Sequence, residues 1–183
     1  QGEGPYLIKD LKNTQLDTSD VRNYAYKLDC RLFLFSTSGA LSEYGKIIVL
    51  NKNTLNVETT ISTSAGKSSS GFAYDDNFIY ISVIKLVSTT YYVHINKYNR
   101  QTLAFIEQSP SIYSGASTFI NVEEMLILNG FLFVTVNVAR MVYKIDPATW
   151  SVSATLYFVA PLKVLKLNNT SFVLTGANTL NST

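Results

Sequence analysis

Short apolar runs alternate with tight polar turns along the chain, and one kind of turn comes back four times. In each copy a polar turn leads into an apolar run that ends in Ser or Thr: Asp29-Cys30-Arg31 before Leu32-Phe33-Leu34-Phe35-Ser36, Asp75-Asp76-Asn77 before Phe78-Ile79-Tyr80-Ile81-Ser82, Asn129-Gly130 before Phe131-Leu132-Phe133-Val134-Thr135, and Asn168-Asn169-Thr170 before Phe172-Val173-Leu174-Thr175. Asn-Gly is a strong hairpin signal because both residues tolerate positive φ. No dozen-residue window carries a helical stripe with caps. The pattern predicts an all-β chain.

A second type of hairpin lies between these copies. Its turn reads apolar, Asn or Asp, two turn residues, Thr, apolar, and the three threonines Thr54, Thr102 and Thr149 are 48 and 47 residues apart. A repeat of roughly 40–50 residues made only of strands is typical of a β-propeller blade. Two hairpins in each repeat predict four-stranded antiparallel blades.

Counting the hairpins predicts about four blades' worth of strands in one domain, residues 1–183. The first type lies near 23–38, 72–88, 123–137 and 161–177, and the second near 45–63, 91–108 and 140–157. A degraded copy of the second type lies at 7–14. The predicted repeats are therefore 23–71, 72–122, 123–160, and 161–183 together with 6–18. Two arrangements stay open: a closed ring with one blade shared between the two ends, or four blades of a larger propeller.

Composition limits the classes of partner. The net charge is +2, the hydrophobic fraction is 46%, and like charges do not cluster. The hydrophobic fraction suffices for a core, while a nucleic-acid or anionic-membrane footprint is not evident. The longest apolar region, 125–136, is interrupted by Asn129-Gly130 and is too short to span a bilayer. A chain that begins Gln1-Gly2-Glu3-Gly4-Pro5 resembles a processed product or an excised segment. We favour a mature N-terminus left by signal-peptide removal, and so expect an extracellular or cell-surface location.

The stretch 60–82, together with Val49-Leu50-Asn51-Lys52-Asn53-Thr54, resembles the YVTN-type propeller repeat. The likeness covers roughly residues 23–178 and implies the propeller fold. Members are often found in surface-layer and other extracellular proteins, and related repeats occur in quinoprotein and lactonase-like enzymes. The loop proline usual in that family is replaced by Lys67 or Ser68, which indicates a divergent member. The Trp-Asp and Gly-His dipeptides of WD repeats are absent.

Catalytic chemistry has little support in the sequence. His94 is the single histidine and Cys30 the single cysteine, so a His/Cys zinc site within the chain is nearly excluded, and no serine lies in a Gly-x-Ser-x-Gly elbow. The pair Asp75-Asp76 is expected to serve turn geometry, and Glu123-Glu124 to face solvent at a strand entrance. We expect Tyr91-Tyr92 to pack, although tyrosines also suit a glycan or protein site. No catalytic, metal or cofactor site is predicted.

Covalent modification is predicted at two kinds of position. Cys30 should lie near a hairpin tip, where it would be a free thiol or form an intermolecular disulfide. Three Asn-x-Ser/Thr sequons make Asn168, Asn169 and Asn181 candidate glycosylation sites. The repeat places both Asn168 and Asn169 in a hairpin turn. Asn169 is the preferred acceptor, because Asn168 is expected to hold the turn geometry.

Three functions agree with these observations. The favoured one is a non-catalytic extracellular structural or adhesive module, with protein subunits or surface glycans as partners and a homo-oligomer or filament as a possible assembly. The alternatives are an intracellular protein-binding scaffold, and part of a propeller enzyme whose ligands lie in blades outside this sequence.

Overall fold

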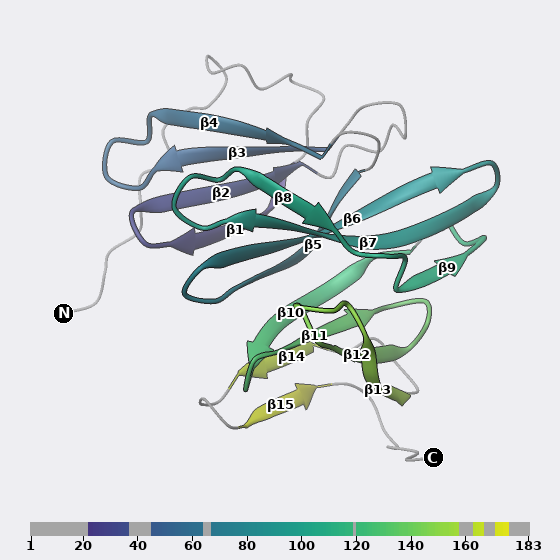
Figure 1. Cartoon of the computed structure of the whole chain (residues 1–183). Helices are drawn as coiled ribbons and strands as arrows, with labels where there is room; N and C mark the ends of the chain where they lie inside the picture. Colours follow the sequence, from purple (N-terminus) through teal and green to yellow (C-terminus); the bar gives the residue numbers. More distant parts are fainter. Residues whose placement is uncertain are drawn as a thin grey trace.

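The computed structural model describes residues 22–36, 45–63, 67–118, 120–157, 163–166 and 171–175. Every regular element within these ranges is a strand (Figure 1). All the pairings are antiparallel. The prediction of an all-β chain with antiparallel sheets is therefore confirmed, while the segment 6–18 lies outside the described residues.

Three sheets follow the chain as simple meanders, each strand pairing with the next one in sequence. Sheet A consists of β1 (Arg22–Leu28), β2 (Arg31–Ser36), β3 (Lys46–Asn51) and β4 (Val57–Ser62). Sheet B consists of β5 (Lys67–Tyr74), β6 (Phe78–Val87), β7 (Thr90–Asn99) and β8 (Phe105–Gln108), with β9 (Tyr113–Gly115) added to β7. Sheet C consists of β10 (Val122–Leu128), β11 (Phe131–Val136), β12 (Met141–Ile145) and β13 (Val152–Tyr157). Each of these sheets begins with a strand of the first hairpin type and ends with one of the second.

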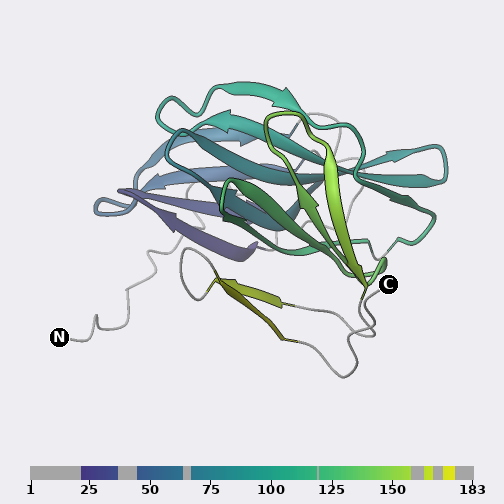
Figure 2. The ribbon, with the colours of Figure 1, turned by 60° about the horizontal axis from the view of Figure 1, so that its bottom comes forward.

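A two-stranded sheet D, made of β14 (Lys163–Lys166) and β15 (Phe172–Thr175), follows sheet C. The sheets succeed one another in space in the order of the chain (Figure 1). Strand β5 lies against β10, and β10 lies against β14, so the first strands of sheets B, C and D are neighbours. Figure 2 shows the β14–β15 hairpin as a separate unit beneath the larger sheets.

Among the described residues, the core consists of two apolar layers between consecutive sheets. The layer between sheets A and B contains Phe33, Phe35, Ile47 and Val49 from sheet A and Phe72, Ile79, Ile81 and Tyr98 from sheet B. The layer between sheets B and C contains Tyr80, Val93 and Ile95 from sheet B and Val122, Leu132, Val134 and Ile145 from sheet C. Sheet B is therefore buried on both faces. This explains why its strands read as continuous apolar runs and not as alternating ones.

Gly71 in β5 allows sheets B and C to approach closely. A Cβ atom at this position would lie 2.6 Å from Met125 Sδ, from Val122 Cγ1 and from Ser82 Oγ. The Ser82 hydroxyl lies 3.0 Å from the Gly71 amide nitrogen, which donates to it. A side chain at residue 71 would thus collide with both its own sheet and the next one.

Sheet B departs from the repeat by a longer central hairpin. Strands β6 and β7 have ten residues each, whereas β2 and β3 have six. Strand β8 covers only the part of β7 from Asn96 to Tyr98, and β9 pairs with Tyr91, Tyr92 and Val93 farther along. The extra strand satisfies backbone groups that the lengthened hairpin would otherwise leave unpaired.

Candidate functional site

The three Asn/Asp-x-x-Thr turns have the same geometry, and they join the third and fourth strands of sheets A, B and C. Asn51 Oδ1 accepts hydrogen bonds from the amides of Asn53 and Thr54, and Asn99 Oδ1 accepts from those of Gln101 and Thr102. In sheet C, Asp146 Oδ1 accepts from the Ala148 amide. Asn and Asp are selected here because a short polar side chain can bond to the backbone two residues ahead.

Each of these turns ends on an apolar residue in the left-handed region. The φ angles of Leu55, Leu103 and Trp150 are 56°, 60° and 60°. The amide of each donates back to the carbonyl of the Asn or Asp four residues earlier, at 2.7–2.9 Å. Leu103 packs on the core layer between sheets A and B, and Trp150 on the layer between B and C. In sheets B and C the turn therefore directs an apolar side chain at the layer shared with the preceding sheet.

A basic side chain of the preceding sheet bonds to the backbone of each following turn. Arg31 of sheet A donates from Nη1 to the carbonyl oxygens of Arg100 and Gln101, at 3.3 and 3.0 Å. Lys97 of sheet B donates from Nζ to the carbonyl oxygen of Pro147, at 3.2 Å. Arg100 and Pro147 are equivalent, because each directly follows the Asn or Asp of its turn. In both seams a basic side chain therefore bonds to the backbone of the following turn, although the donors differ in position: Arg31 opens β2, whereas Lys97 lies within β7.

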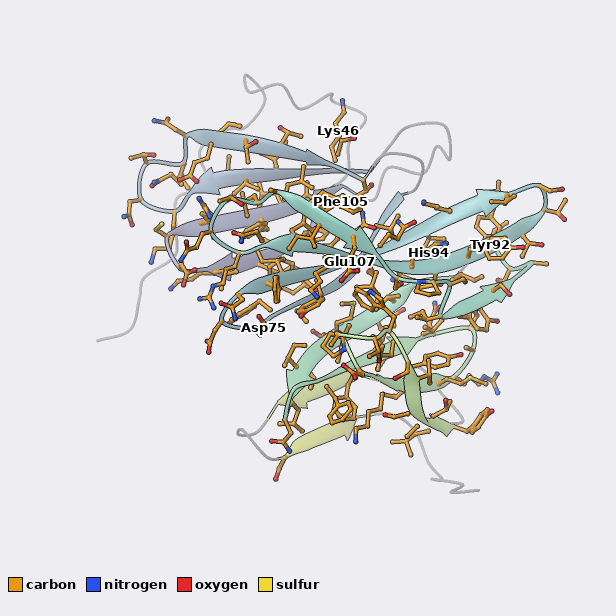
Figure 3. All side chains as sticks on the ribbon, viewed as in Figure 1. Lys46, Asp75, Tyr92, His94, Phe105 and Glu107 are labelled. Carbon is orange, nitrogen blue, oxygen red and sulfur yellow. The ribbon has the colours of Figure 1, made fainter. Side chains whose placement is uncertain are left out.

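A groove of about 470 Å³ lies beside the A/B seam, between the outer strands of the two sheets. Its apolar surface comes from Ile61, Leu103 and Phe105, and the Phe105 side chain is 57% exposed. Figure 3 shows Phe105 on β8. The remaining lining is mostly polar: Arg31, Glu58, Thr59, Thr60, Ser62, Tyr98, Thr102 and Ala104.

The charges in the groove are paired with one another. Arg31 Nε donates to Glu58 Oε2 at 2.9 Å, and Asn51 Nδ2 donates to Glu58 Oε1 at 3.1 Å. The hydrogen bond from Arg31 is the main reason that the pKa of Glu58 is lowered. The groove therefore offers no unpaired charge from this pair to a ligand, and it suits a neutral one.

Strand β4 borders the groove with an open backbone edge. Among the described strands it pairs only with β3. The Thr63 amide donates to the Gly45 carbonyl oxygen at 3.1 Å, and hydrogen-bonded and non-hydrogen-bonded pairs alternate along an antiparallel ladder. The amide and carbonyl of Thr60 and Ser62 consequently face away from β3, toward the open edge.

Beside the groove, a buried polar chain runs along sheet B. Lys85 Nζ donates to Gln108 Oε1, and Gln108 Nε2 donates to Asn96 Oδ1, both at 2.6 Å. Asn96 Nδ2 donates to the Tyr98 hydroxyl at 3.0 Å. Burial raises the pKa of Tyr98 above its ordinary value. This chain satisfies polar groups inside an otherwise apolar layer, and its hydrogen bond from Asn96 opposes the effect of burial on the pKa of Tyr98.

A bidentate ion pair joins the hairpin turns of sheets A and B. Arg100 donates from Nη2 and Nε to the two carboxylate oxygens of Asp29, at 2.7 and 3.1 Å, and from Nη1 to the Asp75 carbonyl oxygen at 2.7 Å. The hydrogen bond from Arg100 lowers the pKa of Asp29. The exposed pair itself adds little free energy, but its planar geometry fixes how the two turns are aligned.

The residues considered for catalysis serve local structure and lie apart. Asp75 Oδ1 accepts from the amides of Asn77 and Phe78, as expected for turn chemistry, and Asp75 Oδ2 accepts from the buried Tyr80 hydroxyl. His94 is half-buried, and its Nδ1 lies 3.0 Å from the Ser109 carbonyl oxygen. Figure 3 places Asp75 and His94 toward opposite ends of sheet B. They do not form a common site.

The other sequence candidates have separate positions. Glu123 and Glu124 are half-buried at the start of β10, and Tyr91 is buried in the layer between sheets B and C. Cys30 is exposed in the turn between β1 and β2, at the hairpin tip that the repeat predicted. Asn168, Asn169 and Asn181 lie outside the described residues. Within the described ranges, no three His, Cys, Asp or Glu side chains form a group able to hold a metal ion.

Comparisons with known proteins give little likeness. No protein-family model matches the chain, and no curated protein matches it significantly. Among solved structures, glutaminyl cyclase from Myxococcus xanthus is similar at 13% identity with a TM-score of 0.30. That match covers 67% of this chain and 65% of the cyclase chain, so the sequence spans just under two thirds of it. In the described part of the chain, no helix is long and apolar enough to cross a membrane.

Proposed function

We propose that this protein is a non-catalytic, extracellular structural or adhesive module built as a β-propeller, and that it holds an extended segment of a partner protein in the groove between sheets A and B. Successive four-stranded meanders with neighbouring first strands support the propeller arrangement, as does the resemblance to YVTN-type repeats. On this proposal sheets A, B and C are three blades, and sheet D begins a fourth.

The single observation that carries the binding role is the open edge of β4 along the groove. An extended peptide adds to such an edge through main-chain hydrogen bonds, and pockets for alternate side chains give specificity. Thr60 and Ser62 supply the outward amides and carbonyls. Ile61, Leu103 and Phe105 supply an apolar surface for one side chain of the peptide. Because Arg31 and Glu58 neutralise each other, the preferred peptide is uncharged where it crosses them.

A proline variant tests this role without disturbing the sheet. Thr60→Pro removes an amide that points away from β3, so strand addition is blocked while the β3–β4 ladder keeps its bonds. Thr155→Pro is the matched control, because Thr155 pairs with Tyr143 in sheet C as Thr60 pairs with Ile48 in sheet A.

The probe is a displayed library of random linear peptides, selected on the wild-type protein. We expect enriched sequences with apolar residues at alternate positions, which bind the wild type and Thr155→Pro but not Thr60→Pro. Phe105→Ala should weaken binding as well. If no peptide is enriched, or if Thr60→Pro binds the enriched peptides as well as the control does, the groove is not a strand-addition site.

A further inference from the structure

Strand β13, the fourth strand of sheet C, is an edge strand without charge. Among the described strands it pairs only with β12, and its residues Val152–Tyr157 include no charged residue and no proline. The fourth strands of the other two sheets each carry a carboxylate, Glu58 in β4 and Glu107 in β8. Natural proteins commonly use charged residues or prolines to keep an edge strand from pairing with another chain. Strand β13 has neither.

Strand β13 also exposes large apolar side chains. Val152, Leu156 and Tyr157 are 46%, 39% and 48% exposed, whereas β4 exposes only Val57 in this way. Apolar side chains gathered on one exposed element mark an interaction surface. An uncharged extended strand with apolar side chains and a free backbone edge has the properties of the segment that suits the groove between sheets A and B.

The chain cannot place β13 in its own groove. Sheet B lies between sheets A and C, with an apolar layer on each of its faces. Figure 1 shows β4 and β13 on opposite sides of the molecule. A strand β13 that enters the groove must therefore belong to a second copy of the protein.

We propose that β13 of one copy adds to the edge of β4 of a second copy, in the groove between that copy's sheets A and B, so that copies join head to tail. This inference rests on the strand-addition role proposed for the groove and names its partner. The two strands have six residues each. Thr155 pairs with Tyr143 as Thr60 pairs with Ile48, so the backbone groups of Thr155 face the open edge as those of Thr60 do.

The side chains of the two strands favour this pairing over pairing between identical strands. Glu58 is the one charged residue of β4, its carboxylate is bonded to Arg31 at 2.9 Å, and β13 brings no second charge to it. An apolar side chain of β13 would lie against Leu103 and Phe105 in the groove. Two copies of β4 would instead bring two Glu58 carboxylates to one seam and offer the groove only Val57.

A head-to-tail contact leaves one free β13 and one free β4 at the ends of every assembly. Such a heterologous interface continues into a ring or an open filament. A pair of six-residue strands buries less surface than the ~1,600 Å² of a standard interface. The assembly should therefore be weak, reversible and dependent on protein concentration.

Sedimentation velocity with two proline variants of the full chain tests the pairing. Thr60→Pro blocks the edge of β4, and Thr155→Pro blocks the edge of β13. The wild type should gain mass between about 1 µM and 1 mM protein, the range of weak contacts. Neither variant alone should associate, whereas an equimolar mixture should form heterodimers and nothing larger. Circular dichroism of each variant checks that its strands are retained.

Each other result overturns the proposal. Association of Thr155→Pro alone would show that β4 pairs with β4, and association of Thr60→Pro alone would show that β13 pairs with β13. A mixture that stays monomeric excludes head-to-tail pairing. If the wild type binds the enriched peptides but does not self-associate, the groove keeps its proposed role and this inference falls. If the wild type does neither, both fall.

A charge variant gives a second test that leaves the backbone of β13 unchanged. Val152→Lys combined with Leu156→Lys removes two exposed apolar side chains, so the fold is kept while association of the full chain should weaken about tenfold or more. The matched control is Leu86→Lys with Val87→Lys, because these side chains are 40% and 60% exposed on the β6–β7 hairpin. The control should associate as the wild type does. An equal loss in both double variants would show non-specific apolar association and overturn the proposal.

Discussion

At residue 103 a glycine variant should be more stable than an alanine variant, which is the reverse of the usual order. Leu103 has a φ of 60° and packs on the layer between sheets A and B. A left-handed backbone costs a residue with a Cβ about 1–2 kcal/mol. Glycine avoids this strain, but it loses about 0.5–1 kcal/mol relative to alanine through its greater freedom in the unfolded chain. The net expectation is that Leu103→Gly is more stable than Leu103→Ala by about 0.5–1 kcal/mol.

Both variants lose the packing of the leucine. Since the side chain is partly buried, this loss is about half of the ~1.5–3 kcal/mol for a fully buried one. Leu103→Ala should therefore unfold about 1 kcal/mol more easily than the wild type, and Leu103→Gly should lie between the two. Urea unfolding followed by far-ultraviolet circular dichroism measures these differences, and a 1 kcal/mol change corresponds to about 2–4 °C in Tm for a chain of this size.

Ala104→Gly is the matched control for this comparison. Ala104 is the next residue, it is exposed, and its φ is not positive, so here glycine should cost about 0.5–1 kcal/mol relative to alanine. The difference in unfolding free energy between the glycine and alanine forms must therefore have opposite signs at residues 103 and 104. If Leu103→Ala is as stable as Leu103→Gly or more so, the left-handed turn is not maintained in solution.

Four further outcomes are expected. Lys97→Met should lower the unfolding free energy by about 1–3 kcal/mol, because Pro147 loses its charged donor; calorimetry should show no comparable loss for Lys52→Met, whose ammonium makes no hydrogen bond among the described residues. Gly71→Ala should cost about 1–3 kcal/mol through overpacking, and urea titration that gives wild-type stability would contradict the close approach of sheets B and C. Burial raises the pKa of Tyr143 to about 12, above its ordinary value of about 10. The native state therefore holds this proton up to a higher pH than the unfolded chain does. The stability that the Tyr143 hydroxyl contributes is thus fully present below pH 10 and is lost as the pH rises toward 12. A Tyr143→Phe variant whose unfolding free energy, measured by urea titration, falls with alkaline pH as steeply as that of the wild type would refute this. Cys30 should react fully with Ellman's reagent in the native protein, because its side chain is exposed, and a reaction that needs denaturant would contradict its place at the hairpin tip.

The hairpin plan was predictable from sequence because its signals are local. Asn129 and Gly130 both have positive φ, 51° and 78°, as the Asn-Gly dipeptide indicated. The side-chain hydrogen bonds of Asn51 and Asn99 depend only on residues two and three positions ahead. Because both partners of such hydrogen bonds are close in sequence, the local sequence is enough to predict them.

Other features depend on contacts far along the chain, and sequence reasoning missed them. Leucine at residue 103 gave no sign of a left-handed backbone, since glycine is the residue expected there; packing on sheet A overrides that preference. The bond from Arg31 to the turn at Arg100 joins residues 69 positions apart. One signal was available: Lys97 and Lys144 occupy one repeat position inside apolar strands, where a charged residue needs a partner. The added strand β9 had no comparable signal.

Trp150 is an intrinsic fluorescence probe of the seam between sheets B and C. It is the only tryptophan in the chain, its ring lies 6.4 Å from that of Tyr80 on sheet B, and its indole nitrogen is the one buried side-chain nitrogen or oxygen without a hydrogen-bond partner in the described structure. Opening between sheets B and C would admit water to this indole and shift its fluorescence emission to the red. Opening between sheets A and B would leave the emission unchanged while circular dichroism followed the loss of strands. The two seams are therefore separable by their spectra, and a stepwise opening of the sheets would be visible as two transitions in an otherwise unlabelled protein.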